Sequence, residues 1–181
     1  RRSYWSGFVT GLPGLRGGEH FGLTVPDLDA AERFLCDVLG ARTVFDGGTI
    51  SDSDTMARVL GARPGDSCRY RFYRLGTGLN LEVFEYRTEL TGEHPANPQP
   101  GGHHIALYVD DIYAAADHLS RHGVAMSGPP EHVTDGPAAG SDWLYFMAPW
   151  GLQMELVSYP NGKAYEAKAE VRLWSPLRPA D

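Results

Sequence analysis

The 181-residue sequence contains only two cysteines, Cys36 and Cys68. Two cysteines are too few for a disulfide framework, and their spacing matches no cysteine-rich metal site, so we expect both to be reduced. Basic residues are also in deficit: 16 lysines and arginines face 23 aspartates and glutamates, which gives a net charge of −7. This balance, with no basic cluster, argues against nucleic acid or an anionic membrane as a partner.

A long hydrophobic run is absent as well. No apolar stretch approaches the ~18–20 residues that a helix needs to cross a bilayer. Arg1 and Arg2 could suggest a twin-arginine export signal, but glycine and proline interrupt the segment behind them and no hydrophobic region follows. We therefore expect a cytoplasmic protein without a membrane span.

What the sequence does contain is an internal repeat. Residues 17–41 align without a gap with residues 101–125, and residues 78–86 align with residues 151–159. The matched positions include Gly17 with Gly101, Gly18 with Gly102, His20 with His104, Leu23 with Leu107, Val25 with Val109, Asp27 with Asp111, and Glu82 with Glu155. Two similar halves in the same order indicate a duplicated structural module.

Each half has the pattern of a strand, a helix and further strands. Asp27 and Asp111 are expected to cap the two helices, and Gly40 and Gly123 are expected to end them. Strands are expected near residues 20–25, 69–75, 79–86, 104–109, 142–148 and 152–159, with a short extra helix over residues 53–60. The expected organisation is an N-terminal extension over residues 1–16, a first module over 17–87, a Pro/Gly-rich linker over 88–100, a second module over 101–160 and a C-terminal tail over 161–181.

Alternation along the strands separates an apolar face from a second face that carries histidine and glutamate. The apolar face is the expected seat of each module's helix. The other face carries His20 and Glu82 in the first half and His104 and Glu155 in the second. A single histidine or glutamate in a strand is usually a solvated residue. The recurrence of both residue types at equivalent positions favours a functional site, and a pseudo-twofold arrangement could bring all four together.

Four segments of the sequence resemble the vicinal oxygen chelate superfamily: "EHFGLTVPDLDAAERFLCDVLG", "LNLEVFEY", "HHIALYVDDI" and "YFMAPWGLQMEL". This superfamily includes glyoxalase I, bleomycin-resistance proteins, methylmalonyl-CoA epimerase and extradiol dioxygenases. The resemblance covers about residues 17–160. It implies an α+β fold of two tandem βαβββ modules, whose curved mixed sheet surrounds a cleft with one divalent metal ion.

The resemblance also implies a ligand set. Carried over by position, the metal ligands are His20, Glu82, His104 and Glu155. His103 aligns with Glu19 and is expected to point away. Two imidazoles and two carboxylates suit Zn, Ni, Co, Mn or Fe. Such an ion acts as a Lewis acid that stabilises an enediolate as a proton leaves carbon. Glu82 and Glu155 are both candidates for the base, and the sequence does not choose between them.

The resemblance leaves three kinds of activity open. The first is a lyase, isomerase or epimerase that acts on a small α-oxygenated carbonyl compound, although the "NTM" segment and glutathione-binding arginines of glyoxalase I are missing. The second is an Fe(II) extradiol dioxygenase, whose site His20, His104 and Glu155 would supply. Tyr145 matches a tyrosine of the dioxygenase signature, but His132 lies too far from it to be the signature histidine. Tyr145 is thus either catalytic or a core aromatic residue.

The third kind is a metal-free binding protein of the bleomycin-resistance type, which the presence of all four ligand residues disfavours. For each alternative the expected partner is a small molecule, and the apolar outer strand of each module suggests a homodimer.

Overall fold

The computed structural model describes residues 17–51, 53–92 and 94–179, so the expected N-terminal extension over residues 1–16 lies outside the described residues. The first half contains β1 (Phe21–Thr24), α1 (Leu28–Arg33), the π-helical turn η1 (Phe34–Val38), β2 (Arg42–Ile50), α2 (Ser53–Leu60), β3 (Ser67–Leu75) and β4 (Leu79–Arg87). The second half contains β5 (His104–Tyr108), α3 (Ile112–Arg121), β6 (Glu131–His132), β7 (Asp142–Met147), β8 (Gln153–Ser158) and the short 3₁₀ helix η2 (Ala164–Ala167). None of the helices in the described part is long and apolar enough to cross a membrane.

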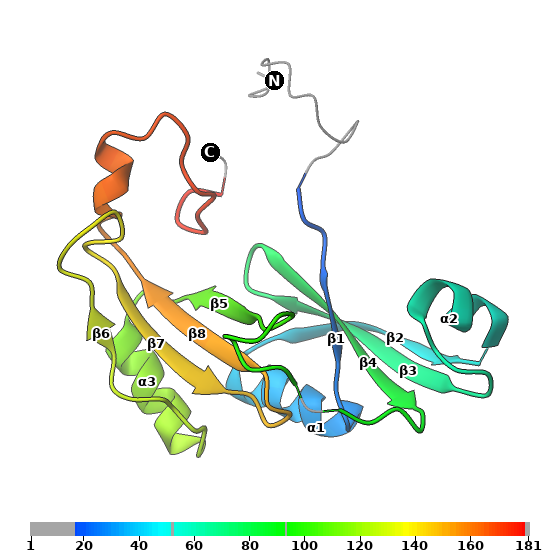
Figure 1. Cartoon of the computed structure of the whole chain (residues 1–181). Coiled ribbons are helices and arrows are strands. Elements are labelled where there is room, and N and C mark those ends of the chain that lie inside the picture. The colour runs from blue at the N-terminus through cyan, green and yellow to red at the C-terminus, as the bar shows by residue number, and fades with distance from the viewer. Residues whose placement is uncertain (1–16, 52, 93, 180–181) are drawn as a thin grey trace.

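The strands form two four-stranded sheets with the same topology, in the orders β1-β4-β3-β2 and β5-β8-β7-β6 (Figure 1). In each sheet the first strand pairs parallel with the last, and the remaining neighbours pair antiparallel. A parallel pair needs a crossover connection, and the polypeptide through α1 or α3 provides it. The expected α+β fold of two tandem modules with mixed sheets is therefore confirmed.

The helix boundaries lie where the sequence predicts them. The carboxylates of Asp27 and Asp111 each accept hydrogen bonds of 2.8–3.0 Å from two backbone N–H groups of the first helical turn. Gly40 and Gly123, just beyond the two helices, have φ angles of +74° and +68°. Glycine is favoured there because a side chain is strained at such angles.

Two strands were not expected from the sequence. The edge strand β2 contains register shifts between Thr43 and Phe45 and between Asp46 and Gly48. Each bulge interrupts the two-residue alternation by which a strand is recognised. The strand β6 has only two residues, Glu131 and His132, which is too short for any alternation to be detected.

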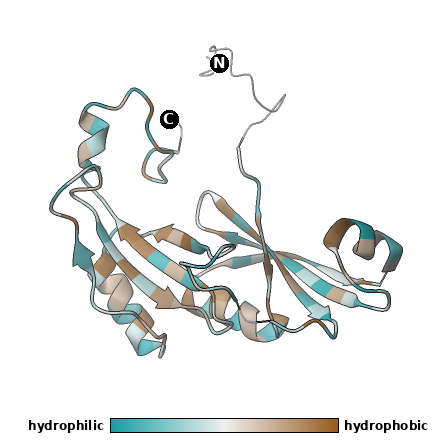
Figure 2. Ribbon diagram, in the orientation of Figure 1, coloured by the Kyte–Doolittle hydropathy of each residue, from teal (hydrophilic) through white to brown (hydrophobic). Residues whose placement is uncertain are grey.

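One hydrophobic core runs through both modules. The helices α1 and α3 lie on the same side of the two sheets (Figure 1), and the apolar residues that alternate along the strands (Figure 2) are buried: Leu23, Leu81, Val83, Ile105, Leu144, Met154 and Leu156. Phe34 packs edge-to-face on Trp150 with ring centroids 5.5 Å apart. His118 contacts the carbonyl oxygen of Val38 through Nε2 at 2.8 Å. These contacts join the modules and leave the opposite faces of the sheets for other residues.

Candidate functional site

The duplicated modules place a histidine beside a glutamate twice. In the first module, Nε2 of His20 lies 3.1 Å from Oε2 of Glu82. In the second module, Nε2 of His104 lies 3.1 Å from Oε2 of Glu155. The strand register explains the repetition, because the residue two positions after each histidine is paired with the glutamate across the parallel strands. Positions two residues apart along a strand face the same side of the sheet, so the histidine and the glutamate share a face.

An aromatic residue completes each pair. Phe72 lies opposite Glu82 in the antiparallel register, and Tyr145 lies opposite Glu155. Both rings meet the histidine of their module edge-on, with centroids 5.5 Å apart for His20–Phe72 and 5.3 Å apart for His104–Tyr145. We call His20, Glu82 and Phe72 the first half-site, and His104, Glu155 and Tyr145 the second half-site.

Further aromatic rings extend the face of the first half-site. Phe45 stacks on Phe72 at 4.7 Å, and Tyr70 stacks on Phe84 at 5.8 Å. Phe84 in turn stacks on Tyr86 at 5.7 Å. A row of rings beside a carboxylate gives apolar walls near a charged group, which is a common composition for a small-molecule site.

Glu19 orients the histidine of the first half-site. Its carboxylate contacts Nδ1 of His20, and this hydrogen bond raises the pKa of His20 above its ordinary value. The interaction leaves Nε2 facing Glu82. His103, at the equivalent position in the second module, instead contacts a backbone carbonyl and packs against His94 with ring centroids 4.8 Å apart. We did not anticipate the role of Glu19, although its position next to His20 was a visible signal.

The second half-site is electrostatically distinct. Burial raises the pKa of Glu155, while His104, Lys163 and Tyr145 oppose that increase. Burial and the neighbouring Glu155 together raise the pKa of Tyr145. The phenol therefore stays protonated at neutral pH and can donate a hydrogen bond to the Glu155 carboxylate.

Each pair has donor atoms that suit a divalent ion. Ligand bonds of about 2.1 Å place a nitrogen and an oxygen in adjacent coordination positions about 3 Å apart. The observed Nε2–Oε2 separations of 3.1 Å match that spacing. Within the described residues, however, no group of three or more His, Cys, Asp or Glu is gathered to hold a metal ion. The structure thus brings the four expected ligands together as two pairs, and the complete site stays a prediction.

Comparison with known proteins gives the family. Residues 18–156 match the model of the Glyoxalase/Bleomycin resistance protein/Dioxygenase superfamily. A 2-epi-5-epi-valiolone epimerase from Actinomyces sp is 42% identical over 168 residues, which cover 92% of each chain.

Two solved structures have a similar fold. The glyoxalase family protein from Bacillus cereus has a TM-score of 0.64 at 18% identity, and the match covers 80% of this chain and 94% of that one. The fosfomycin resistance protein FosX from Listeria monocytogenes, in complex with Mn(II) and sulfate, has a TM-score of 0.55 at 18% identity, with 86% and 99% of the chains covered.

The match to the epimerase confirms the first of the three expected kinds of activity, a lyase, isomerase or epimerase. At the level of the family, divalent metal binding is also supported, since FosX carries Mn(II). By its sequence over residues 18–156 and by the topology of its two modules, the chain belongs to the glyoxalase/bleomycin resistance protein/dioxygenase superfamily.

Proposed function

We propose that this protein is a metal-dependent epimerase, and that it inverts the stereocentre next to the carbonyl group of a ketone of the 2-epi-5-epi-valiolone type. The duplicated His–Glu pair carries the proposal, because it offers two nitrogen and two oxygen ligands on the faces opposite the helices. The name of the 42% identical relative supports the choice of substrate.

The proposed ligands are His20, Glu82, His104 and Glu155. This donor set suits Zn, Ni, Co, Mn or Fe in the divalent state. A bound ion would supply Lewis-acid stabilisation of the negative charge that develops on the substrate oxygens.

The chain's own residues then have to move one proton. Inversion at a carbon next to a carbonyl requires that a base removes the proton from one face and that an acid returns a proton to the other, so no atom is gained or lost. Glu82 and Glu155 are the proposed proton carriers. Tyr145 is the proposed third catalytic residue, because its phenol can hold the Glu155 carboxylate or donate to a substrate oxygen.

We further propose that the four ligands meet in a homodimer, where the first half-site of one protomer faces the second half-site of its partner. Two observations support this arrangement. Each half-site is a matched pair rather than a full ligand set, and Phe21, Val44 and Phe45 of the first module are about half exposed, at 50%, 59% and 47%. A twofold axis would generate two equivalent sites from two such chains.

The deciding experiment follows proton exchange and metal content together. The protein is purified without chelators, its metal is measured, and 2-epi-5-epi-valiolone is incubated with it in D₂O. We expect solvent deuterium at the carbon next to the carbonyl, together with the epimer, detected by NMR. Alanine substitution of any of the four ligands should abolish both metal binding and exchange. Glu131→Ala is a suitable control, since Glu131 is exposed in β6.

Two results would overturn the proposal. Absence of stoichiometric metal, even after metal is supplied, would exclude this site. Iron that survives Glu82→Ala but is lost from the other three variants, with oxygen uptake on catechols, would point to a dioxygenase instead.

A further inference from the structure

The C-terminal segment after β8, residues 160–179, is fixed to the rest of the protein at several points. The backbone N–H groups of Ala164 and Tyr165 donate 3.0 Å hydrogen bonds to carbonyls of the loop at residues 137–139. Farther along, the Trp174 ring lies against Gly78, where an added Cβ would come within 2.4 Å of it. The segment lies on the side of the sheets away from α1 and α3 (Figure 1), which is the side of the half-sites.

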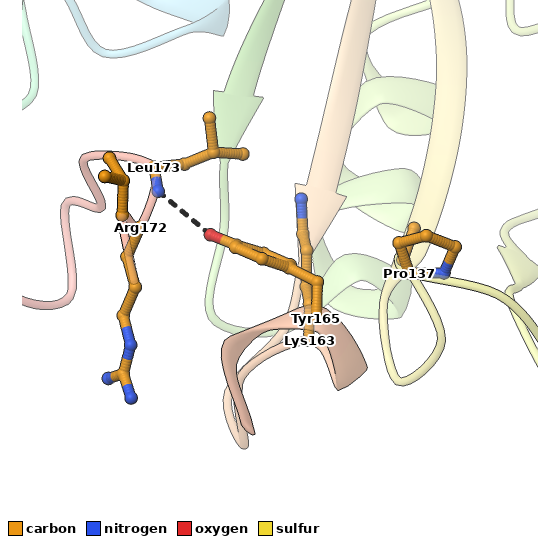
Figure 3. Close-up of a pocket in the computed structure, with 7 residues that line it drawn as sticks. Pro137, Lys163, Tyr165, Arg172 and Leu173 are labelled. Carbon is orange, nitrogen blue, oxygen red and sulfur yellow. Dashed lines mark hydrogen bonds between the residues drawn. The ribbon is translucent and has the colours of Figure 1, made fainter. Parts of the chain in front are cut away.

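A cavity of about 420 Å³ opens between this segment and the second module. It is lined by Pro137, Ala138, Lys163, Tyr165, Val171, Arg172 and Leu173. The Tyr165 hydroxyl accepts a 3.0 Å hydrogen bond from the Leu173 backbone and so holds the segment in place (Figure 3). Val171 and Leu173 are 82% and 70% exposed. Apolar side chains that stay open to solvent at a cavity are available to contact a ligand.

Lys163 belongs both to the cavity and to the surroundings of the second half-site. Figure 3 shows its side chain extending toward β8, whereas Arg172 extends in the opposite direction. The Lys163 ammonium lies 4.4 Å from the centre of the Tyr159 ring. Tyr159 directly follows β8, four residues after Glu155, and packs edge-on against Tyr108 with ring centroids 4.9 Å apart.

The sequence comparisons separate this segment from the core of the family. The part of this chain that matches the family model ends at residue 156. The alignment with the epimerase covers 92% of this chain, so fewer than 16 residues fall outside it. Lys163 has 18 residues after it and must lie inside that alignment. The start of the segment, through Lys163, is therefore covered by the alignment with the epimerase, whereas the match to the general family model does not include it.

We propose that the cavity is a subsite for the part of the substrate remote from the reacting carbon, where Lys163 donates a hydrogen bond to a substrate hydroxyl. This inference rests on the proposed function, because it takes the same ketone as the ligand. The apolar lining suits the carbon skeleton, and the ammonium suits an oxygen substituent. Lys163 thus contacts the substrate and takes no part in holding the metal ion.

Steady-state kinetics of three variants test the proposal. Lys163→Met should raise KM for 2-epi-5-epi-valiolone roughly 10-fold or more, since hydrogen bonds to charged groups contribute strongly, should change KM more than kcat, and should leave the metal content close to wild type. Lys163→Arg should restore much of the lost affinity. The exposed Lys168 in the same segment provides the matched control, and Lys168→Met should leave KM unchanged. An unchanged KM in Lys163→Met, or loss of metal from it, overturns the inference.

A second measurement does not depend on turnover. The protein is treated with an amine-acetylating reagent, and modification of Lys163 and Lys168 is followed by mass spectrometry. The ketone should slow acetylation of Lys163 and not of Lys168. Protection without proton exchange would uphold the subsite while the proposed epimerase activity fails. Proton exchange in the wild type without protection of Lys163 would uphold the activity and overturn the subsite.

Discussion

Phe72 and Tyr145 occupy equivalent positions in the two modules, each directly across the antiparallel register from a site glutamate and edge-on to a site histidine. Each half-site therefore contains one histidine, one glutamate and one aromatic ring. They differ in one hydroxyl group, which lies beside Glu155. If the half-sites combine into one centre, this hydroxyl makes the two glutamates chemically unequal.

Replacement of Tyr145 by phenylalanine removes that difference. We expect Tyr145→Phe to lower kcat for epimerisation about 10- to 100-fold, because a positioned proton donor typically contributes at least that much, while the metal content stays unchanged. Phe72→Tyr is the matched control, since it adds a hydroxyl at the equivalent place, and in combination with Tyr145→Phe it should not restore kcat. A wild-type kcat in Tyr145→Phe would show that Tyr145 is only a packing residue.

Glu19 should act on metal affinity through His20. Its carboxylate holds Nδ1 of His20 and so directs Nε2 toward Glu82. Loss of such an orienting partner typically costs 10- to 100-fold in metal affinity, so we expect Glu19→Gln to weaken binding by about 10-fold in a competition titration with a chelator. His103→Gln changes the equivalent residue of the second module and should have no effect, because His103 contacts a backbone carbonyl outside the half-site. Equal effects of the two substitutions would contradict this role.

Arg71 should govern the acid stability of the first module. Its side chain is only 14% exposed, and its guanidinium binds Asp29 and Asp46 at 2.8 Å and Glu32 at 2.7 Å. Hydrogen bonds from Arg71 lower the pKa of Asp29 and of Asp46 below their ordinary values. Carboxyl groups with a lowered pKa stabilise the fold above the ordinary aspartate pKa of about 4 and lose that contribution as the pH falls further.

We therefore expect Arg71→Met to lower the free energy of unfolding at pH 7 more than the control variant does, and to flatten its decline below about pH 4. Urea unfolding between pH 3 and pH 7 measures both effects. Arg121→Met is the control, because Arg121 forms an exposed pair with Asp117 at 3.1 Å, and such pairs contribute little. A steep acid decline that persists in Arg71→Met would place the responsible carboxylates elsewhere.

The sequence predicted those features that depend on local periodicity. His20 and His104 could be assigned because the first directly precedes and the second begins a regular strand, and because the duplication placed them in register. Strand β2 could not be assigned, since its bulges at Thr43–Phe45 and Asp46–Gly48 interrupt the alternation. The separation of the four ligands into two pairs also could not be predicted from the sequence. It depends on how the modules pack, through contacts such as Phe34 with Trp150, and those contacts follow no sequence period.

The way in which the half-sites combine can be tested with mixed dimers. If each centre uses His20 and Glu82 of one protomer and His104 and Glu155 of its partner, neither His20→Ala nor His104→Ala has an intact centre alone. In a dimer that contains one chain of each variant, however, one centre carries both substitutions and the other carries none. Differently tagged chains, co-expressed and purified through both tags, provide this mixed dimer.

We expect the mixed dimer to bind about half the metal of the wild-type dimer and to recover about half its epimerase activity, because a twofold-symmetric pair has two equivalent centres. A mixture of His20→Ala with Glu82→Ala is the matched control: both substitutions fall in the first half-site, so each centre of that dimer carries one defect and no activity should return. If all four ligands came from one chain, both mixtures would be equally inactive. That result, or a monomer in light scattering with a full complement of metal, would contradict the shared centre and would require the two sheets of one chain to close on each other instead.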